Sequence, residues 1–334
     1  HADFDNKLVR DYAKEKNIRI VGHHETGTQI ENYENQLDSA FAYCKRNGIR
    51  VVKTGYVNDG AQNIKRTGSD GKIYKEWHHG QYMVEHFRKV LETSAKYEVG
   101  IVVHEPIKDT GLRRTYPNMV SREGARGQEF NGFMGTKDNN KPNHTTILPF
   151  TRLLSSPMDY TPGIFNLKDY RYYSQDNRQI NPDHHIPSTI SKELALYVVI
   201  YAPVQMAADL PEHYEAHLDA FEFILDVPTD WENTITLNGE IGEYITVVRK
   251  DINSNDWYLG SITNEDSRDI EINLSFLDPG LEYSATIYKD PKDGGWESKP
   301  EQVVIETKIV KNSDDYKIVL PSGGGQAIKF SPIK

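Results

Sequence analysis

Ionisable side chains stand at the ends of three predicted strands. A His-His-Glu run (23–25) follows one strand, Lys53 lies at the end of the next, and His104 and Glu105 end the third. In a parallel β/α barrel the carboxyl ends of the strands face one another and carry the active site, so these groups are predicted to meet. The alternative is that each is a solvated loop residue or a member of an internal ion pair.

Two further carboxylates lie close together in the segment 121–129. Glu123 and Glu129 are six residues apart, which corresponds to about 20 Å along a strand and to different faces of a helix. Only a compact turn, which Gly124 and Gly127 permit, can direct both carboxylates to one site. Alternatively, both pair at the surface with the two neighbouring arginines.

These carboxylates, drawn from three segments of the chain, favour one of two chemistries. Two carboxylates that flank a glycosidic bond supply the acid and the base of sugar hydrolysis. Additional carboxylates, without cysteine, suit a hard cation such as Ca²⁺. A zinc-type barrel hydrolase is the competing hypothesis, because Lys53 and His104 lie on adjacent predicted strands. It is less favoured, since the rings of the contiguous pair His23 and His24 diverge from one strand end.

The elements that must position these residues alternate between helix and strand patterns over about the first 230 residues. Apolar residues at helical spacing predict helices around 4–12, 37–44, 83–95 and 191–208. Short apolar runs predict strands at 18–21, 50–55 and 99–103, with weaker signals at 118–120 and 145–150. This alternation indicates parallel βαβ units. Residues 58–76 have no periodicity and are predicted to form a surface loop.

The pattern changes near residue 232, where several short segments alternate apolar and polar residues. Such strands, separated by turn signals, are typical of an antiparallel β-sandwich. The predicted fold is therefore α/β, with a partial (β/α)8 TIM-type barrel over residues 1–232 and a C-terminal antiparallel β-sandwich over residues 233–334.

Composition excludes several classes of protein. The chain has 334 residues and a formal net charge of −10, and this acidic balance argues against a nucleic-acid partner. No apolar run approaches the roughly 20 residues of a membrane helix, so no membrane insertion is predicted. Cys44 is the only cysteine, so an intrachain disulfide is impossible and the compartment stays open. A globular protein with a small polar ligand is expected.

The sequence resembles glycoside hydrolase family 97, in particular its calcium-dependent inverting α-glucosidases of starch-utilisation systems. The motifs that carry the resemblance run in family order: GHHET (22–26), VKTGYV (52–57), HEPIKDTGLRRTYPN (104–118), REGARGQEF (122–130), NKPNHTTILPFTRLLSSPMDYTPGIF (140–165) and APVQMAADLPEHY (202–214). The resemblance implies a β/α barrel with a C-terminal β-sandwich. It also implies exo-acting hydrolysis of α-glucosidic linkages in malto-oligosaccharide-like substrates.

The resemblance assigns roles to four carboxylates. Glu129 corresponds to the general acid, and Glu25 and Glu105 correspond to candidate bases that activate water. Glu105 and Glu123 match Ca²⁺ ligands, and Glu129 is near enough in sequence to contribute to that site. Because a nearby dication weakens a base, Glu25 is expected to carry more of the proton transfer, and Glu105 mainly to hold metal and water.

The remaining site residues concern the substrate and the stereochemistry. His23, Lys53 and His104 fall where the family contacts sugar hydroxyls. Retaining members place a nucleophilic Asp where this chain has Gly55, which has no carboxylate to attack the anomeric carbon. Inversion is therefore expected, with carboxyl groups about 6.5–9.5 Å apart. The alternatives are an α-galactosidase of the same family and a non-catalytic sugar-binding protein or fragment.

The resemblance also implies a partner beside the oligosaccharide substrate. Eight strands close a TIM-type barrel, and about six can be placed here, beginning at what resembles the third. We therefore expect the N-terminal half of the same protein to be a missing or separate part. The family resemblance implies a periplasmic or secreted location, although no signal segment is recognised in the sequence.

Overall fold

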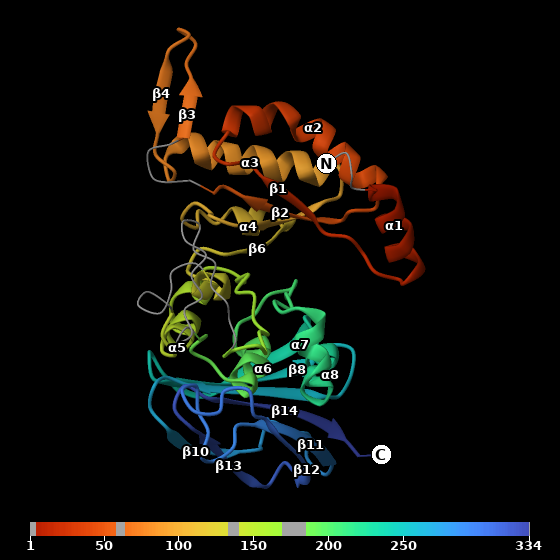
Figure 1. Cartoon of the computed structure of the whole chain (residues 1–334), viewed down its shortest axis with the longest axis vertical. Coiled ribbons are helices and arrows are strands. Elements are labelled where there is room, and N and C mark those ends of the chain that lie inside the picture. Colours follow the sequence, from red (N-terminus) through yellow and green to blue (C-terminus); the bar gives the residue numbers. More distant parts are fainter. Residues whose placement is uncertain (1–4, 58–63, 133–139, 169–184, 334) are drawn as a thin grey trace. The chain divides into compact units, whose positions relative to one another are not determined.

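The structure, a computed structural model, describes residues 5–57, 64–132, 140–168 and 185–333 (Figure 1). It divides into two compact units, His1–Gly124 and Ala125–Lys334. Each unit has its own buried apolar clusters, so each is described by itself. The domain boundary predicted after residue 232 is a different division of the chain and stays a prediction.

The first unit is built on a parallel sheet with the order β1-β2-β5-β6. Its strands are β1 (Gly22–Glu25), β2 (Val51–Gly55), β5 (Gly100–Val103) and β6 (Met119–Arg122). Its helices are α1 (Asn6–Glu15), α2 (Ile30–Arg46), α3 (Gln81–Lys96) and α4 (Leu112–Thr115). Helices connect the parallel strands, as the sequence pattern predicted, and the sheet forms part of a β/α barrel.

One face of this sheet is covered by helices and the other carries the polar residues. Phe41 of α2 and Phe87 of α3 share a buried cluster with Val52 of β2, and Figure 1 shows both helices on the same side of the sheet. Successive strand residues point to opposite faces. His23 and the other odd-numbered residues of β1 and β2 therefore lie on the face away from α2 and α3.

The predicted strand at 18–21 is wrong, because β1 begins only at Gly22. Ile18 and Val21 are 62% and 47% exposed, so the apolar run lies outside the core. In α1 the apolar residues Leu8 and Tyr12 are also 66% and 60% exposed. The apolar stripes that predicted burial here have no covering layer among the described residues.

The predicted loop at 58–76 is wrong in its second part. Residues 58–63 lie outside the described residues, and β3 (Ile64–Thr67) pairs with β4 (Ile73–Glu76) as an antiparallel hairpin. Gly71, with a φ of +75°, supplies the left-handed residue of the turn. Ile64 is fully buried, so a single apolar anchor fixes a hairpin that otherwise lacks apolar periodicity.

The second unit contains the predicted β-sandwich. A six-stranded antiparallel sheet has the order β12-β11-β14-β9-β8-β7, and β10 pairs with β13. The strands are β7 (Trp231–Glu240), β8 (Tyr244–Asp251), β9 (Trp257–Thr263), β10 (Arg268–Asn273), β11 (Glu282–Lys289), β12 (Val304–Lys311), β13 (Asp315–Leu320) and β14 (Gly325–Pro332). Side chains of both sheets share one buried cluster, which confirms the sandwich.

Helices precede the sandwich in this unit and cover the other face of its large sheet (Figure 1). They are η1 (Gln128–Gly132), α5 (His144–Ile147), η2 (Leu148–Phe150), η3 (Arg152–Leu154), α6 (Ile190–Val199), α7 (Pro211–Glu215) and α8 (Leu218–Asp226). No helix in the described part of the chain is long and apolar enough to cross a membrane.

Two predicted elements of this region differ from the structure. The strand predicted at 145–150 is wrong, because the segment forms α5 and η2; Pro149 has no amide proton for a strand ladder. The helix predicted at 191–208 is shorter, since α6 ends at Val199 and Ile200 is extended. Pro203 disfavours helical backbone in the residue before it, which limits any continuation.

Candidate active site

The strand ends of the first unit bring the predicted polar residues to one edge of the parallel sheet. In the register of β1 with β2, His23 is opposite Lys53 and Glu25 is opposite Gly55. Register partners of parallel strands share a face, so these four residues line the face that the helices leave uncovered. His104 follows β5 and is 5% exposed.

Gly55 lies directly against the Glu25 carboxylate. A Cβ atom on residue 55 would collide with Oε2 of Glu25 and would lie 3.1 Å from its Cδ and 3.3 Å from Nε2 of His23. The space that a side chain would need at position 55 is therefore taken by Glu25. An aspartate at this position cannot fit unless Glu25 moves.

Two consecutive backbone amides after β2 hold the two candidate bases. The N–H of Tyr56 donates to Oε2 of Glu105 at 2.7 Å, and that of Val57 donates to Oε1 of Glu25 at 3.1 Å. Gly27 N–H also donates to Oε1 of Glu25, at 2.8 Å. These amide hydrogen bonds fix the positions of both carboxylates beside the end of β2.

Glu105 has an unusual backbone as well as a fixed side chain. Its φ is +40°, a left-handed conformation that costs of order 1–3 kcal/mol in a residue other than glycine. The ring of His78 donates from Nε2 to the Glu105 carbonyl at 2.8 Å. The Glu105 N–H donates to Oε2 of Glu123 at 3.3 Å. The surrounding residues thus stabilise a strained backbone at a candidate catalytic position.

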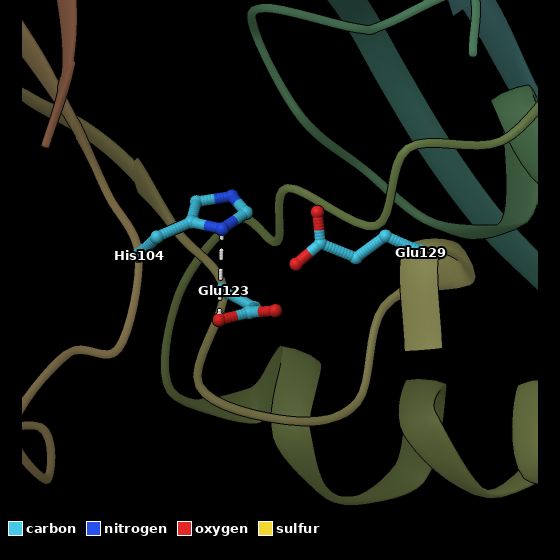
Figure 2. A group of neighbouring side chains, drawn as sticks. All are labelled: His104, Glu123 and Glu129. Carbon is cyan, nitrogen blue, oxygen red and sulfur yellow. Dashed lines mark ion pairs between the residues drawn. The ribbon is translucent and has the colours of Figure 1, made fainter. Parts of the chain in front are cut away.

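Glu123 lies beside both residues that follow β5. Figure 2 shows the His104 ring facing the Glu123 carboxylate, and their Nδ1 and Oε2 atoms are 3.6 Å apart. Glu105 and Glu123 supply carboxylate oxygens in one place, which are the ligands that Ca²⁺ prefers. Among the described residues, the second oxygen of Glu105 accepts no hydrogen bond. The donor set therefore fits a hard cation, although the nearby imidazole is also suited to zinc.

The two adjacent histidines of β1 do diverge, as the sequence predicted. The Nδ1 of His24 lies 3.0 Å from the Tyr33 hydroxyl of α2. Burial lowers the pKa of His24, which favours the neutral ring. His23, in contrast, lies on the Glu25 face with its Nε2 3.9 Å from Oε2 of that residue. A metal site that uses both rings is excluded by this geometry.

A buried hydrogen-bond chain beneath the amide pair escaped the sequence analysis. The Tyr56 hydroxyl is 2.9 Å from Nε2 of His86, and Nδ1 of His86 is 2.9 Å from Oε1 of Glu34. The hydrogen bond to His86 and that from Lys89 hold the pKa of Glu34 at about 2. Burial lowers the pKa of His86. The only sequence signal for this chain was the position of Tyr56 directly after Gly55.

Glu129 belongs to the second unit, where it is an exposed residue of η1. It is also drawn in Figure 2. The preceding residue, Gln128, is 2% exposed and hydrogen-bonds to Glu193 of α6 and to Tyr160. Sequence reasoning missed Gln128 and Glu193, because 65 residues separate them and neither lies in a spacing pattern.

Comparisons with known proteins identify the family of the chain. The family model described as glycoside hydrolase 97 matches residues 1–125, and the model described as glycosyl-hydrolase 97 C-terminal, oligomerisation, matches residues 230–331. A protein of Bacteroides thetaiotaomicron named retaining alpha-galactosidase is 29% identical over 332 residues, which are 98% of this chain and 45% of that protein.

Solved structures of a glycoside hydrolase family 97 enzyme from Pseudoalteromonas sp. strain K8 are similar to the whole chain. Its complex with acarbose is 45% identical, covers 100% of this chain and 50% of its own, and has a TM-score of 0.93. A variant of that enzyme in complex with panose has a TM-score of 0.92 at the same identity and coverage. The chain spans about half the length of these relatives. With both family models and these structures in agreement, the chain belongs to glycoside hydrolase family 97.

Proposed function

We propose that the protein containing this chain is an exo-acting glycoside hydrolase that cleaves α-glucosidic linkages with inversion. The observation that carries the proposal is Gly55, whose missing side chain is replaced in space by the Glu25 carboxylate. A retaining glycosidase needs a carboxylate nucleophile close to the anomeric carbon. In this chain the residue at that position has none, and the carboxylate that fills the space is that of Glu25, which the amides of Gly27 and Val57 hold in place.

The proposed reaction divides the work among three glutamates. Glu129 donates a proton to the oxygen of the leaving sugar as the glycosidic bond breaks. A water molecule attacks the anomeric carbon from the opposite side and gives its proton to Glu25. Glu105 helps to hold that water, and His23, Lys53 and His104 contact sugar hydroxyls. Proton transfer from positioned side chains contributes typically 10²–10⁴-fold to the rate.

The proposed substrate class follows from the relatives with the higher sequence identity. The enzyme that is 45% identical was solved with acarbose and panose, and panose is built of α-linked glucose. This favours malto-oligosaccharide-like substrates. The second candidate is an α-galactosidase, because the 29% identical relative carries that name together with the word retaining. Gly55 argues against the retaining half of that description for this chain.

We also propose that Ca²⁺ binds at Glu105 and Glu123, with Glu129 as a further ligand. The support is the donor set, since Glu105 N–H reaches the Glu123 carboxylate and both side chains end in oxygen. When bound, Ca²⁺ would supply positive charge that attracts the oxygen atoms of the sugar. Dialysis of the complete protein against a chelator should abolish hydrolysis, and Ca²⁺ but not Zn²⁺ should restore it. Restoration by Zn²⁺ alone would favour the zinc alternative.

An N-terminal part of the same protein is the proposed partner. A TIM-type barrel has eight strands, whereas the parallel sheet described here has four, with β1 at one edge. Leu8, Tyr12 and Ile18, which precede β1 in the chain, are each at least 60% exposed. Strands added at the β1 edge would extend the sheet toward a closed barrel. The family also favours a periplasmic or secreted protein. Co-purification of a polypeptide that pairs with this unit tests the proposal.

Two measurements on the complete protein test the function. Initial rates on aryl α-glucosides and aryl α-galactosides should favour the glucoside at least tenfold; the reverse preference would establish the second candidate. Incubation with an activated fluoroglycoside, followed by intact-mass spectrometry, should show no covalent adduct, because inversion forms no glycosyl-enzyme intermediate. A sugar adduct on the protein would contradict inversion, and no hydrolysis of either substrate would favour a binding protein.

A further inference from the structure

The residue before the proposed acid is the most firmly held part of its segment. Gln128 donates its backbone N–H to the Tyr160 carbonyl at 2.8 Å. Its side-chain oxygen accepts from the Tyr160 hydroxyl at 3.0 Å, and its side-chain amide donates to Oε1 of Glu193 at 3.0 Å. Gln128 is 2% exposed while Glu129 is exposed. The Gln128 side chain is therefore buried and hydrogen-bonded, and the side chain of the next residue, Glu129, is exposed.

The backbone on the N-terminal side of Gln128 is anchored in the same way. The His144 ring donates from Nε2 to the Arg126 carbonyl at 2.8 Å, and the Asn140 amide donates to the Gly127 carbonyl at 3.0 Å. Asn131, on the other side, accepts the Asn140 N–H at 2.9 Å. The segment that carries Glu129 is thus bound to its surroundings before and after it, and little freedom remains for the backbone of residue 129.

Glu193 is the side chain to which the Gln128 side-chain amide donates. It lies in α6 with no exposed surface, and the other nine residues of that helix are also buried. Oε1 accepts from Gln128 and from the Ser188 hydroxyl, and Oε2 accepts from Gly163 N–H at 2.8 Å. A buried carboxylate is costly to stability even when it is hydrogen-bonded. The carboxylate is satisfied by three donors from three separate segments, Gln128, Gly163 and Ser188, so Glu193 ties the segment of the proposed acid to α6.

We propose that Glu193 is a positioning residue for Glu129, which it fixes through Gln128 so that the acid points at the leaving oxygen. This inference rests on the proposed function, in which Glu129 is the acid. Misplacement of a catalytic group by about 1 Å can cost about 10²-fold in rate. The loss should fall on proton donation, so it should depend on the leaving group of the substrate.

The test compares two leaving groups in the complete protein. Glu193→Gln should lower kcat on oligosaccharides about 10- to 100-fold and on an activated aryl glycoside less than about threefold. Its pH–rate profile should change on the limb that reports the acid. Tyr160→Phe, which removes only the hydroxyl that reaches Gln128, should show the same selectivity to a smaller extent. This second variant keeps the test available if Glu193→Gln does not fold.

The matched control is Tyr258→Phe, which removes another buried hydroxyl of the same unit. That hydroxyl donates to the Asp226 carbonyl at 3.0 Å and has no contact with η1. Equal losses on both substrates, or the same selectivity in Tyr258→Phe, would overturn the proposal and leave Glu193 a stabilising residue. Glu129→Gln separates the proposed acid from the proposed positioning residue. If the loss in Glu129→Gln does not depend on the leaving group, Glu129 is not the acid. If the loss in Glu129→Gln depends on the leaving group and the loss in Glu193→Gln does not, only the inference about Glu193 fails.

Discussion

The proposed bases and the proposed acid are held in different ways. Glu25 and Glu105 stand at strand ends of the first unit, and the consecutive amides of Tyr56 and Val57 hold their carboxylates directly. Glu129 is an exposed side chain on η1. The residue before it, Gln128, is hydrogen-bonded to Glu193 of α6. The bases are thus positioned by local backbone, and the acid by a distant buried side chain. Changes near the bases should act on water activation, and changes near η1 on departure of the leaving group.

The largest effect is expected at the acid itself. Glu129→Gln should lower kcat on oligosaccharides about 10²–10⁴-fold, because their leaving oxygen needs a proton. An activated aryl glycoside, whose leaving group needs little protonation, should keep a substantial part of its rate. Steady-state kinetics on both substrates measure the difference. Equal losses of kcat on the two substrates would show that Glu129 is not the acid, and the contrast between the acid and the bases would no longer hold.

The next effect distinguishes the two candidate bases. Glu25→Ala should lose about 10²-fold or more in kcat, and sodium azide should restore part of the rate, because a small anion can act where the base is missing. Glu105→Ala should lose activity without azide rescue, since we assign it mainly to metal and water. Calcium content should be measured in both variants. Rescue of Glu105→Ala alone, with calcium still bound to each, would reverse the assignment.

A smaller effect is expected from a single methyl group at Gly55. Gly55→Ala places a Cβ where Oε2 of Glu25 lies, so the carboxylate must move, and kcat should fall about tenfold or more. Gly22→Ala is the control in the neighbouring strand: its Cβ would lie 3.1 Å from a Val52 methyl and should affect stability more than rate. A Gly55→Ala enzyme with unchanged kcat would show that the position of Glu25 does not matter.

The smallest effect concerns the hydrogen-bond chain beneath Tyr56. The pKa of Glu34 is about 2, below its ordinary value of 4.5, because of the hydrogen bond to His86. Its stabilisation is therefore full above about pH 4.5 and is lost as pH falls toward 2. Glu34→Gln should lower the free energy of unfolding by on the order of 2 kcal/mol at pH 7. In denaturant titrations this difference should shrink steadily below about pH 4.5 and nearly vanish only near pH 2; a constant difference would contradict the pKa shift.

The sequence was sufficient for the residues whose positions depend on local pattern. Glu25 ends β1 and Glu105 closely follows β5, and parallel pairing brings such strand ends together without knowledge of the rest of the fold. Glu193 and Gln128 could not be paired in the same way, because a buried polar contact 65 residues apart leaves no periodicity. Two predicted strands were wrong. Ile18 is apolar but exposed, so its run forms no buried strand. The β-branched run near Thr145 is helical, and Pro149 has no amide proton for a strand ladder.

The configuration of the first sugar released tests the central claim most directly. The complete protein is mixed with an α-linked oligosaccharide, and the anomeric protons are followed by NMR before mutarotation equalises the two forms. With Gly55 at the nucleophile's position and water activated by Glu25, the first product should be the β-anomer. The α-anomer as first product would contradict inversion, and with it the role that we assign to the space shared by Gly55 and Glu25.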